Sequence, residues 1–82
     1  MPVASYFRSE DDAFTQLMGY INEGQSRTRV RWLYYRERAS TMHLSVEKPD
    51  FWTVSGREHG EPARLIIHFA SDRVDAIREE LL

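Results

Sequence analysis

The first part of the chain carries apolar residues at helical spacing. They recur at i, i+3, i+4 and i+7, as Phe14, Leu17, Met18 and Ile21. This spacing forms one apolar face of an α-helix. Ser9 is a suitable N-cap, the acidic residues at 10–12 suit the positive end of the helix dipole, and Gly24 suits a left-handed C-cap. The pattern predicts an amphipathic helix over residues 9–23.

Residues 27–36 alternate with a period of two instead. Arginine occupies positions 27, 29 and 31 and leads directly into the aromatic run at 32–35. In a β-strand, alternate side chains point to opposite faces of the sheet. The pattern predicts a strand whose core face holds the even-numbered residues, Trp32 among them. Its opposite face would hold Arg29, Arg31, Leu33 and Tyr35.

The rest of the chain predicts three further strands and a second helix. These strands cover residues 41–47, 51–55 and 63–70, joined by a proline turn at 48–50 and a loop at 56–62. Beyond them, Ser71 is a candidate N-cap, and Val74, Ile77 and Leu81 lie at helical spacing. We therefore predict a C-terminal helix over residues 71–82.

These elements predict a small α+β fold. Because the connections are short, neighbouring strands should pair antiparallel. The predicted architecture is a two-layer sandwich, in which a four-stranded antiparallel meander sheet packs one face against the N-terminal and the C-terminal helix. Residues 3–7 are a candidate fifth strand, and residues 1–82 form a single domain. The inner face would hold Val30, Trp32, Tyr34, Met42, Leu44, Val46, Val54, Leu65, Ile67 and Phe69.

Length and composition limit the classes of protein to consider. With 82 residues and no cysteine, the chain can form one small core and has neither disulfides nor thiolate metal ligands. The net charge of −2 is unevenly distributed: residues 1–26 carry −3 (one base, four acids), residues 27–38 carry +4 (five bases, one acid) and residues 39–82 carry −3 (five bases, eight acids). The basic charge is therefore concentrated in the predicted arginine strand.

The bare face of the predicted sheet is the candidate binding surface. Its predicted partner-binding residues are Arg29, Arg31, Leu33, Tyr35, His43, Arg64, Ile66 and His68. Arg and Tyr are enriched at protein-interface hot spots, and apolar residues on a solvent-facing sheet favour contact with a protein. A protein partner is therefore our first interpretation.

Three alternatives remain for the same face. It could bind single-stranded RNA or DNA, with arginines on phosphates and Tyr35 as a stacking platform, although an isoelectric point near 5.9 argues against this. It could form a homodimer, because an isologous contact would bury Leu33 and Ile66 without a foreign partner. Or it could be a solvated face whose arginines form weak cross-strand ion pairs.

The sequence does not predict an enzyme. The histidines, His43, His59 and His68, stand at no metal-ligand spacing, and no glycine-rich phosphate loop or nucleophile elbow occurs. We therefore expect no catalytic residues, no metal site and no cofactor.

No segment of the sequence predicts a membrane anchor. No apolar run approaches the roughly 18 residues of a membrane span, and the chain start lacks the charged and apolar regions of a secretory signal. We expect a cytoplasmic protein. Its small size and lack of catalytic motifs are typical of phage-encoded inhibitors, immunity proteins, antitoxins and small adaptors. The sequence thus predicts a non-enzymatic protein-binding module that acts by masking a partner's surface.

Overall fold

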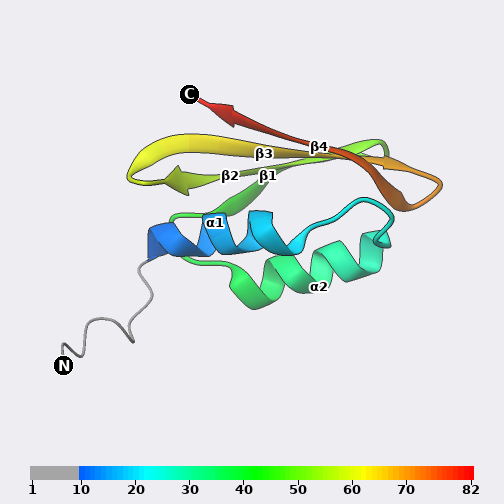
Figure 1. Ribbon diagram of the computed structural model, residues 1–82, viewed down its shortest axis with the longest axis horizontal. Helices are drawn as coiled ribbons and strands as arrows, with labels where there is room; N and C mark the ends of the chain where they lie inside the picture. Colours follow the sequence, from blue (N-terminus) through cyan, green and yellow to red (C-terminus); the bar gives the residue numbers. More distant parts are fainter. Residues whose placement is uncertain (1–9) are drawn as a thin grey trace.

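The computed structural model describes residues 10–82, with side chains described from Ala13 onward. The element order is α1 (Glu10–Tyr20), α2 (Arg27–Glu37), β1 (His43–Glu47), β2 (Phe51–Glu58), β3 (Glu61–Ala70) and β4 (Arg73–Leu81). The strands form one antiparallel sheet in the order β1-β2-β3-β4, and both helices lie on the same side of it (Figure 1). The predicted two-layer α+β sandwich with a four-stranded meander is confirmed. The candidate fifth strand at 3–7 and the Ser9 cap lie outside the described residues.

Helix α1 packs its apolar face against the sheet, as predicted. Phe14, Leu17 and Ile21 are almost fully buried, and the helix ends at Tyr20, three residues before the predicted end. A Cβ atom on Gly56 of β2 would lie 2.6 Å from the ring of Phe14. The sheet therefore needs a glycine where α1 crosses it.

The predicted strand at 27–36 is wrong, because this segment is helix α2. The Ser26 side chain caps the helix by accepting a hydrogen bond from the Arg29 N–H at 3.1 Å. The buried side chains of α2 recur at i, i+3, i+4 and i+7, as Val30, Leu33, Tyr34 and Glu37. The segment therefore has helical periodicity in its buried residues as well as alternation in its arginines. Arg and Leu are also good helix formers, which favours the helix. Trp32, predicted to be a core residue, is 50% exposed, whereas Leu33, predicted to be exposed, is 1% exposed.

The Ser26 cap gives a first test of α2. Replacing Ser26 by Ala removes the acceptor for the Arg29 N–H, and we expect the free energy of unfolding to fall by about 1 kcal/mol. Urea denaturation followed by circular dichroism measures this change. Ser26→Asp is the matched control, because Asp caps as well as Ser and should preserve the stability. Equal stability of the Ala and Asp variants would show that the cap contributes nothing.

The predicted C-terminal helix is also wrong, because its segment forms β4. Ser71 and Asp72 both have positive φ, 53° and 63°, as the two central residues of a type I′ hairpin turn require. The register then shifts, so that Val74 pairs with Phe69 but Ile77 pairs with Ile67. This β-bulge puts two apolar residues three positions apart on one face, which imitates helical spacing.

The predicted loop at 56–62 is a tight hairpin. Strand β2 continues to Glu58 and β3 begins at Glu61, so only His59 and Gly60 form the turn, both with positive φ. The predicted strand at 51–55 is therefore extended by three residues, to Glu58. Residues 57 and 62 pair across this hairpin, which lengthens the sheet beyond the predicted strands.

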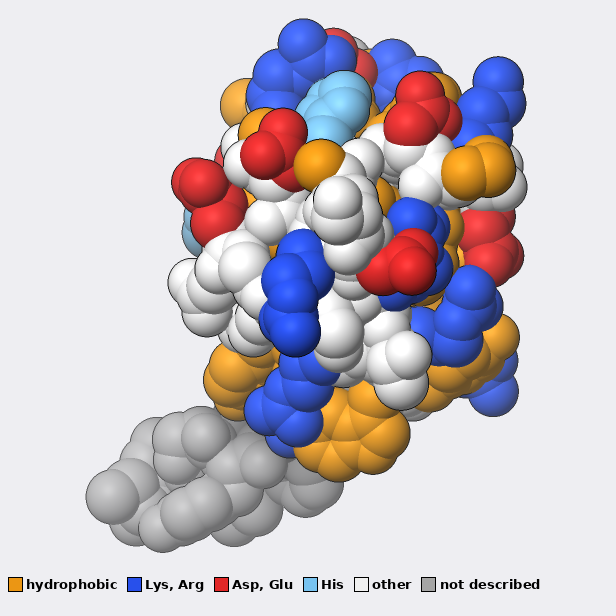
Figure 2. Space-filling model, turned by 90° about the vertical axis from the view of Figure 1, so that its right-hand side faces the viewer, with side chains coloured by type: hydrophobic (Ala, Val, Ile, Leu, Met, Phe, Trp, Pro, Cys, Tyr) orange, Lys and Arg blue, Asp and Glu red, His pale blue; other side chains and the backbone are white. Residues whose placement is uncertain are grey.

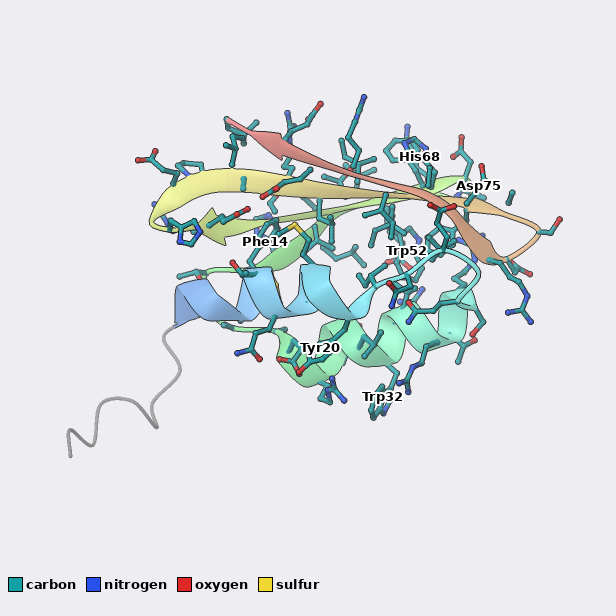
Figure 3. The ribbon with its side chains drawn as sticks, viewed as in Figure 1. Phe14, Tyr20, Trp32, Trp52, His68 and Asp75 are labelled. Carbon is teal, nitrogen blue, oxygen red and sulfur yellow. The ribbon has the colours of Figure 1, made fainter. Side chains whose placement is uncertain are left out.

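The core lies between the sheet and the helices, and the other face of the sheet is open. Trp52 and Phe14 lie between the layers, whereas His68 projects from the opposite side of the sheet (Figure 3). A bulge between Leu44 and Val46 pairs Val46 with Thr53. Val46, predicted to face inward, therefore lies on the open face, because Thr53 alternates with the core residues Trp52 and Val54.

Candidate functional site: the outer face of α2

The predicted partner-binding residues lie on two sides of the molecule. Arg29, Arg31, Leu33 and Tyr35 belong to α2. His43, Arg64, Ile66 and His68 belong to the sheet, where their register partners place them on the open face. The predicted common surface therefore does not form, because the helical layer lies on the other side of the sheet. Leu33 has no access to a partner, since it is buried in the core.

The arginines of α2 divide into an inner pair and an outer set. The inner pair, Arg27 and Arg31, lies one helical turn apart and faces the sheet. Arg27 Nε donates to Asp72 Oδ1 at 3.0 Å, and its Nη2 donates to the Pro49 carbonyl oxygen at 2.7 Å. Arg31 forms an ion pair with Glu47. These contacts fasten α2 to the β1–β2 turn, to β1 and to the β3–β4 turn.

The inner pair also covers the largest core side chain. The guanidinium carbons of Arg27 and Arg31 lie 5.7 and 4.7 Å from the ring centroid of Trp52, and Arg27 lies 4.3 Å from that of Phe69. The hydrogen bond to Glu47 raises the pKa of Arg31 above its ordinary value, so this side chain stays charged wherever the protein is folded. Arg27 and Arg31 therefore have structural roles.

The outer set forms a surface that we call the arginine–aromatic face. Its members are Tyr20, Arg29, Trp32, Tyr35, Arg36 and Arg38. All six are exposed, and Figure 3 shows Trp32 projecting from the helical layer, away from the sheet. The aromatic side chains are unusually accessible for their type: Tyr20 is 43%, Trp32 50% and Tyr35 52% exposed.

Cation–π contacts hold the arginine–aromatic face in order. The guanidinium groups of Arg29 and Arg36 lie 4.7 and 4.8 Å from the Trp32 ring centroid. Arg36 also lies 4.8 Å from the ring of Tyr20, which joins α1 to this face. Each exposed contact of this kind contributes about 0.5–1 kcal/mol. The aromatic rings are therefore positioned before any partner binds.

Of the three arginines of this face, one is paired with a carboxylate and two are not. Arg36 Nε forms an ion pair with the buried Glu37 at 2.9 Å. Arg29 and Arg38, in contrast, form no ion pair with any side chain in the part of the chain that the structure describes, and Arg38 lies over the ring of Tyr35 at 5.3 Å. These two guanidinium groups can each form a paired hydrogen bond with a carboxylate or phosphate.

Basic charge is concentrated around α2. On the side shown in Figure 2, acidic and basic side chains are mixed over the sheet, whereas basic and hydrophobic side chains predominate along the helical layer. The sequence around α2, residues 27–38, accounts for this with five bases and one acid. The arginine–aromatic face is therefore the basic surface of an acidic protein.

The open face of the sheet is less suited to binding. Its central side chains, Thr53 and Ile66, are only 6% and 8% exposed, because neighbouring side chains cover them. Two of its arginines are already paired: Arg64 and Arg78 lie 3.3 and 3.4 Å from the carboxylate of Glu80. Arg64 and Arg78 are therefore less available to a partner than Arg29 and Arg38.

The sequence interpretation missed Trp32, Arg36, Arg38 and Tyr20 as surface residues of one site. The signal that could have located them is the Ser26 cap followed by the buried positions Val30, Leu33 and Tyr34. Once these residues are placed inward, Arg29, Trp32 and Arg36 fall on the opposite side of the helix at i, i+3 and i+7.

Further observations bear on chemistry and on likeness to known proteins. Within residues 10–82, no group of three potential metal ligands comes together and no helix is long and apolar enough to span a bilayer. Comparisons with protein-family models, curated proteins and solved structures found no match. The geometry of the arginine–aromatic face is therefore the basis for a functional proposal.

Proposed function

We propose that this protein is a non-enzymatic binding module that masks an acidic surface of a protein partner through its arginine–aromatic face. One observation carries the proposal: exposed Trp32 and Tyr35 lie beside Arg29 and Arg38, whose charges have no carboxylate partner among the described side chains. Inhibitors, immunity proteins and adaptors act by such occupation of a surface.

The residue types of this face are those that dominate binding energy at protein interfaces. Trp, Tyr and Arg are the residues most enriched at hot spots, where single truncations cost about 2 kcal/mol or more. Their prior ordering by cation–π contacts reduces the side-chain entropy lost on binding, which otherwise costs about 0.5–1.5 kcal/mol per side chain. The face can therefore contribute more affinity than its area suggests.

The chemistry of the partner follows from the unpaired charges. Arg29 and Arg38 would gain charge-assisted hydrogen bonds from carboxylates, whereas a basic partner would be repelled. The rings of Trp32 and Tyr35 supply apolar contact between these charges. A protein surface with Asp or Glu residues around an apolar centre is therefore the best match.

Single-stranded nucleic acid is the second candidate for the same face. Exposed aromatic rings flanked by guanidinium groups could stack on bases while the arginines contact phosphates. The net charge of −2 opposes this interpretation, since nucleic-acid modules usually present a net positive field. We therefore treat nucleic acid as an outcome of the test below.

The experiment compares partner capture by the wild type and by the Trp32→Ala/Tyr35→Ala double variant. In a native lysate, we expect a partner retained by the wild type and lost by the double variant. Once the partner is purified, its affinity should fall at least about 30-fold, the equivalent of one hot spot of 2 kcal/mol. The matched control is His68→Ala on the open sheet face, which should retain the partner.

Three outcomes would contradict the proposal. Equal capture by the wild type and the double variant would remove the arginine–aromatic face as the site. Salt-dependent binding of single-stranded RNA or DNA at about 50 mM salt, lost in the double variant, would replace the protein partner with nucleic acid. A dimer mass by light scattering that the double variant reduces to a monomer mass would identify a second copy as the occupant.

A further inference from the structure

The carboxyl-terminal end of α2 borders an open pocket of about 480 Å³. It is lined by Tyr34, Arg38, Ala39, Ser40, Met42 and His43. The last turns of α2, the connection to β1 and the first residue of β1 therefore form its walls. Because Arg38 belongs to both the pocket and the arginine–aromatic face, the pocket continues that face.

The floor of the pocket is apolar. Met42 and Tyr34 are 4% and 8% exposed, and Ala39 packs against the same core cluster. The Tyr34 hydroxyl oxygen accepts a hydrogen bond from the Leu44 N–H at 3.0 Å, so the polar end of this side chain is bound to β1. An apolar side chain entering the pocket would cover this floor without leaving that hydroxyl unpaired.

The rim of the pocket is cationic. Arg38 is exposed and held over the Tyr35 ring, and it has no ion-pair partner among the described side chains. His43, also exposed, lies on the same rim. The described residues that line the pocket include no Asp or Glu. The rim is therefore complementary to a carboxylate.

The pocket at the other end of α2, in contrast, has carboxylates in its lining. It has a volume of about 410 Å³, and Arg27 and Arg31 on its wall are paired with Asp72 and Glu47 on the same wall. An anionic group would have to displace these carboxylates. Of these two pockets, only the one beside Arg38 combines an apolar floor with an arginine that has no ion-pair partner among the described side chains.

We infer that this pocket is an anchor site, which receives an apolar side chain of the partner protein while Arg38 binds a carboxylate next to it. The inference rests on the proposed function and specifies the partner: an acidic segment that carries one projecting apolar residue. The arginine–aromatic face would contact the surroundings, and the pocket would fix the register of the segment.

Small probes can test the pocket without the partner. N-acetyl-L-phenylalaninate combines an aromatic side chain with a carboxylate, and N-acetyl-L-phenylalaninamide is the same molecule without the charge. In amide-resolved NMR titrations, we expect saturable shifts of the signals of residues 39–43 with the carboxylate. The neutral amide should bind about tenfold more weakly, because a charge-assisted hydrogen bond is lost.

Two variants complete the experiment. Arg38→Gln should weaken binding of the carboxylate about tenfold and leave binding of the amide unchanged. Arg29→Gln, which removes the other unpaired arginine of the arginine–aromatic face, should change neither. Equal binding of the two probes, an unchanged affinity in Arg38→Gln, or no saturable shift up to about 20 mM would each overturn the anchor site. Because none of these measurements uses the partner, failure of the pocket is distinct from failure of the capture experiment.

Discussion

Replacing Trp52 by Ala should lower the free energy of unfolding by about 3–5 kcal/mol, as expected for a large buried aromatic side chain. Trp52 is 2% exposed, and its ring meets that of Phe69 edge-on at 4.8 Å. The substitution would also remove the surface on which Arg27 and Arg31 lie. Since a small domain is stable by only about 5–15 kcal/mol, this loss should be visible as a large shift of the urea midpoint.

Fluorescence supplies an internal check on this experiment. The chain has two tryptophans, so Trp52→Ala leaves only Trp32, whose emission should be that of a solvent-exposed indole in the folded protein. Trp52→Phe is the control, because it retains most of the apolar volume and should cost less than the Ala variant. Stability within about 1 kcal/mol of the wild type in Trp52→Ala would show that the core is assigned incorrectly.

The second large effect is expected at Leu33, with its neighbour Trp32 as the matched comparison. Leu33 is 1% exposed, and Leu33→Ala should cost about 2–5 kcal/mol of unfolding free energy. Trp32 is 50% exposed, and Trp32→Ala should cost less than about 2 kcal/mol, mainly through its two cation–π contacts. Chemical denaturation of the two variants under identical conditions measures the difference.

The order of these two costs distinguishes a helix from a strand at 27–36. If the segment alternated as a strand, Trp32 would lie in the core and its truncation would be the more damaging of the two. A larger loss in Trp32→Ala than in Leu33→Ala would therefore contradict α2. It would also remove the structural basis of the arginine–aromatic face.

The fold class could be predicted from the sequence because most elements had one consistent pattern. Phe14, Leu17 and Ile21 at helical spacing identified α1, and alternation over 63–70 identified β3. Segment 27–37 fitted two patterns, since alternate arginines indicated a strand while Val30, Leu33 and Tyr34 indicated a helix. The hydroxyl of Ser26 favours the helix because it caps the helix N-terminus, but a single N-cap residue is weak evidence when only the sequence is known.

The error at the carboxyl-terminal segment has a different origin. Val74 and Ile77 are three residues apart, a spacing that a regular strand cannot place on one face. The bulge beside Asp75 makes it possible, and bulges leave no clear mark in a single sequence. Ser71 was interpreted as a helix cap, although Ser and Asp are also residues that accept the left-handed turn conformation found at 71 and 72.

The candidate site could be predicted only in part. Arg29 and Tyr35 were expected to be exposed and are exposed, because both patterns put them on the surface. Grouping them with Arg64 and His68 required all four to share a sheet face, and the helix at 27–37 separates them. The pocket beside Arg38 depends on how the α2–β1 connection packs against Tyr34, and local periodicity contains no information about such tertiary contacts.

The basic charge around α2, +4 over residues 27–38, and the charge of −3 over residues 39–82, which include the sheet, give the molecule an uneven charge distribution despite its small net charge of −2. In the field of an acidic partner, this distribution would turn α2 toward the partner before the surfaces touch. Orientation of this kind raises the association rate and weakens as ions shorten the Debye length, about 8 Å at physiological ionic strength. The basic charge of α2 would thus govern how fast the protein finds its target, while the aromatic contacts govern how long it stays.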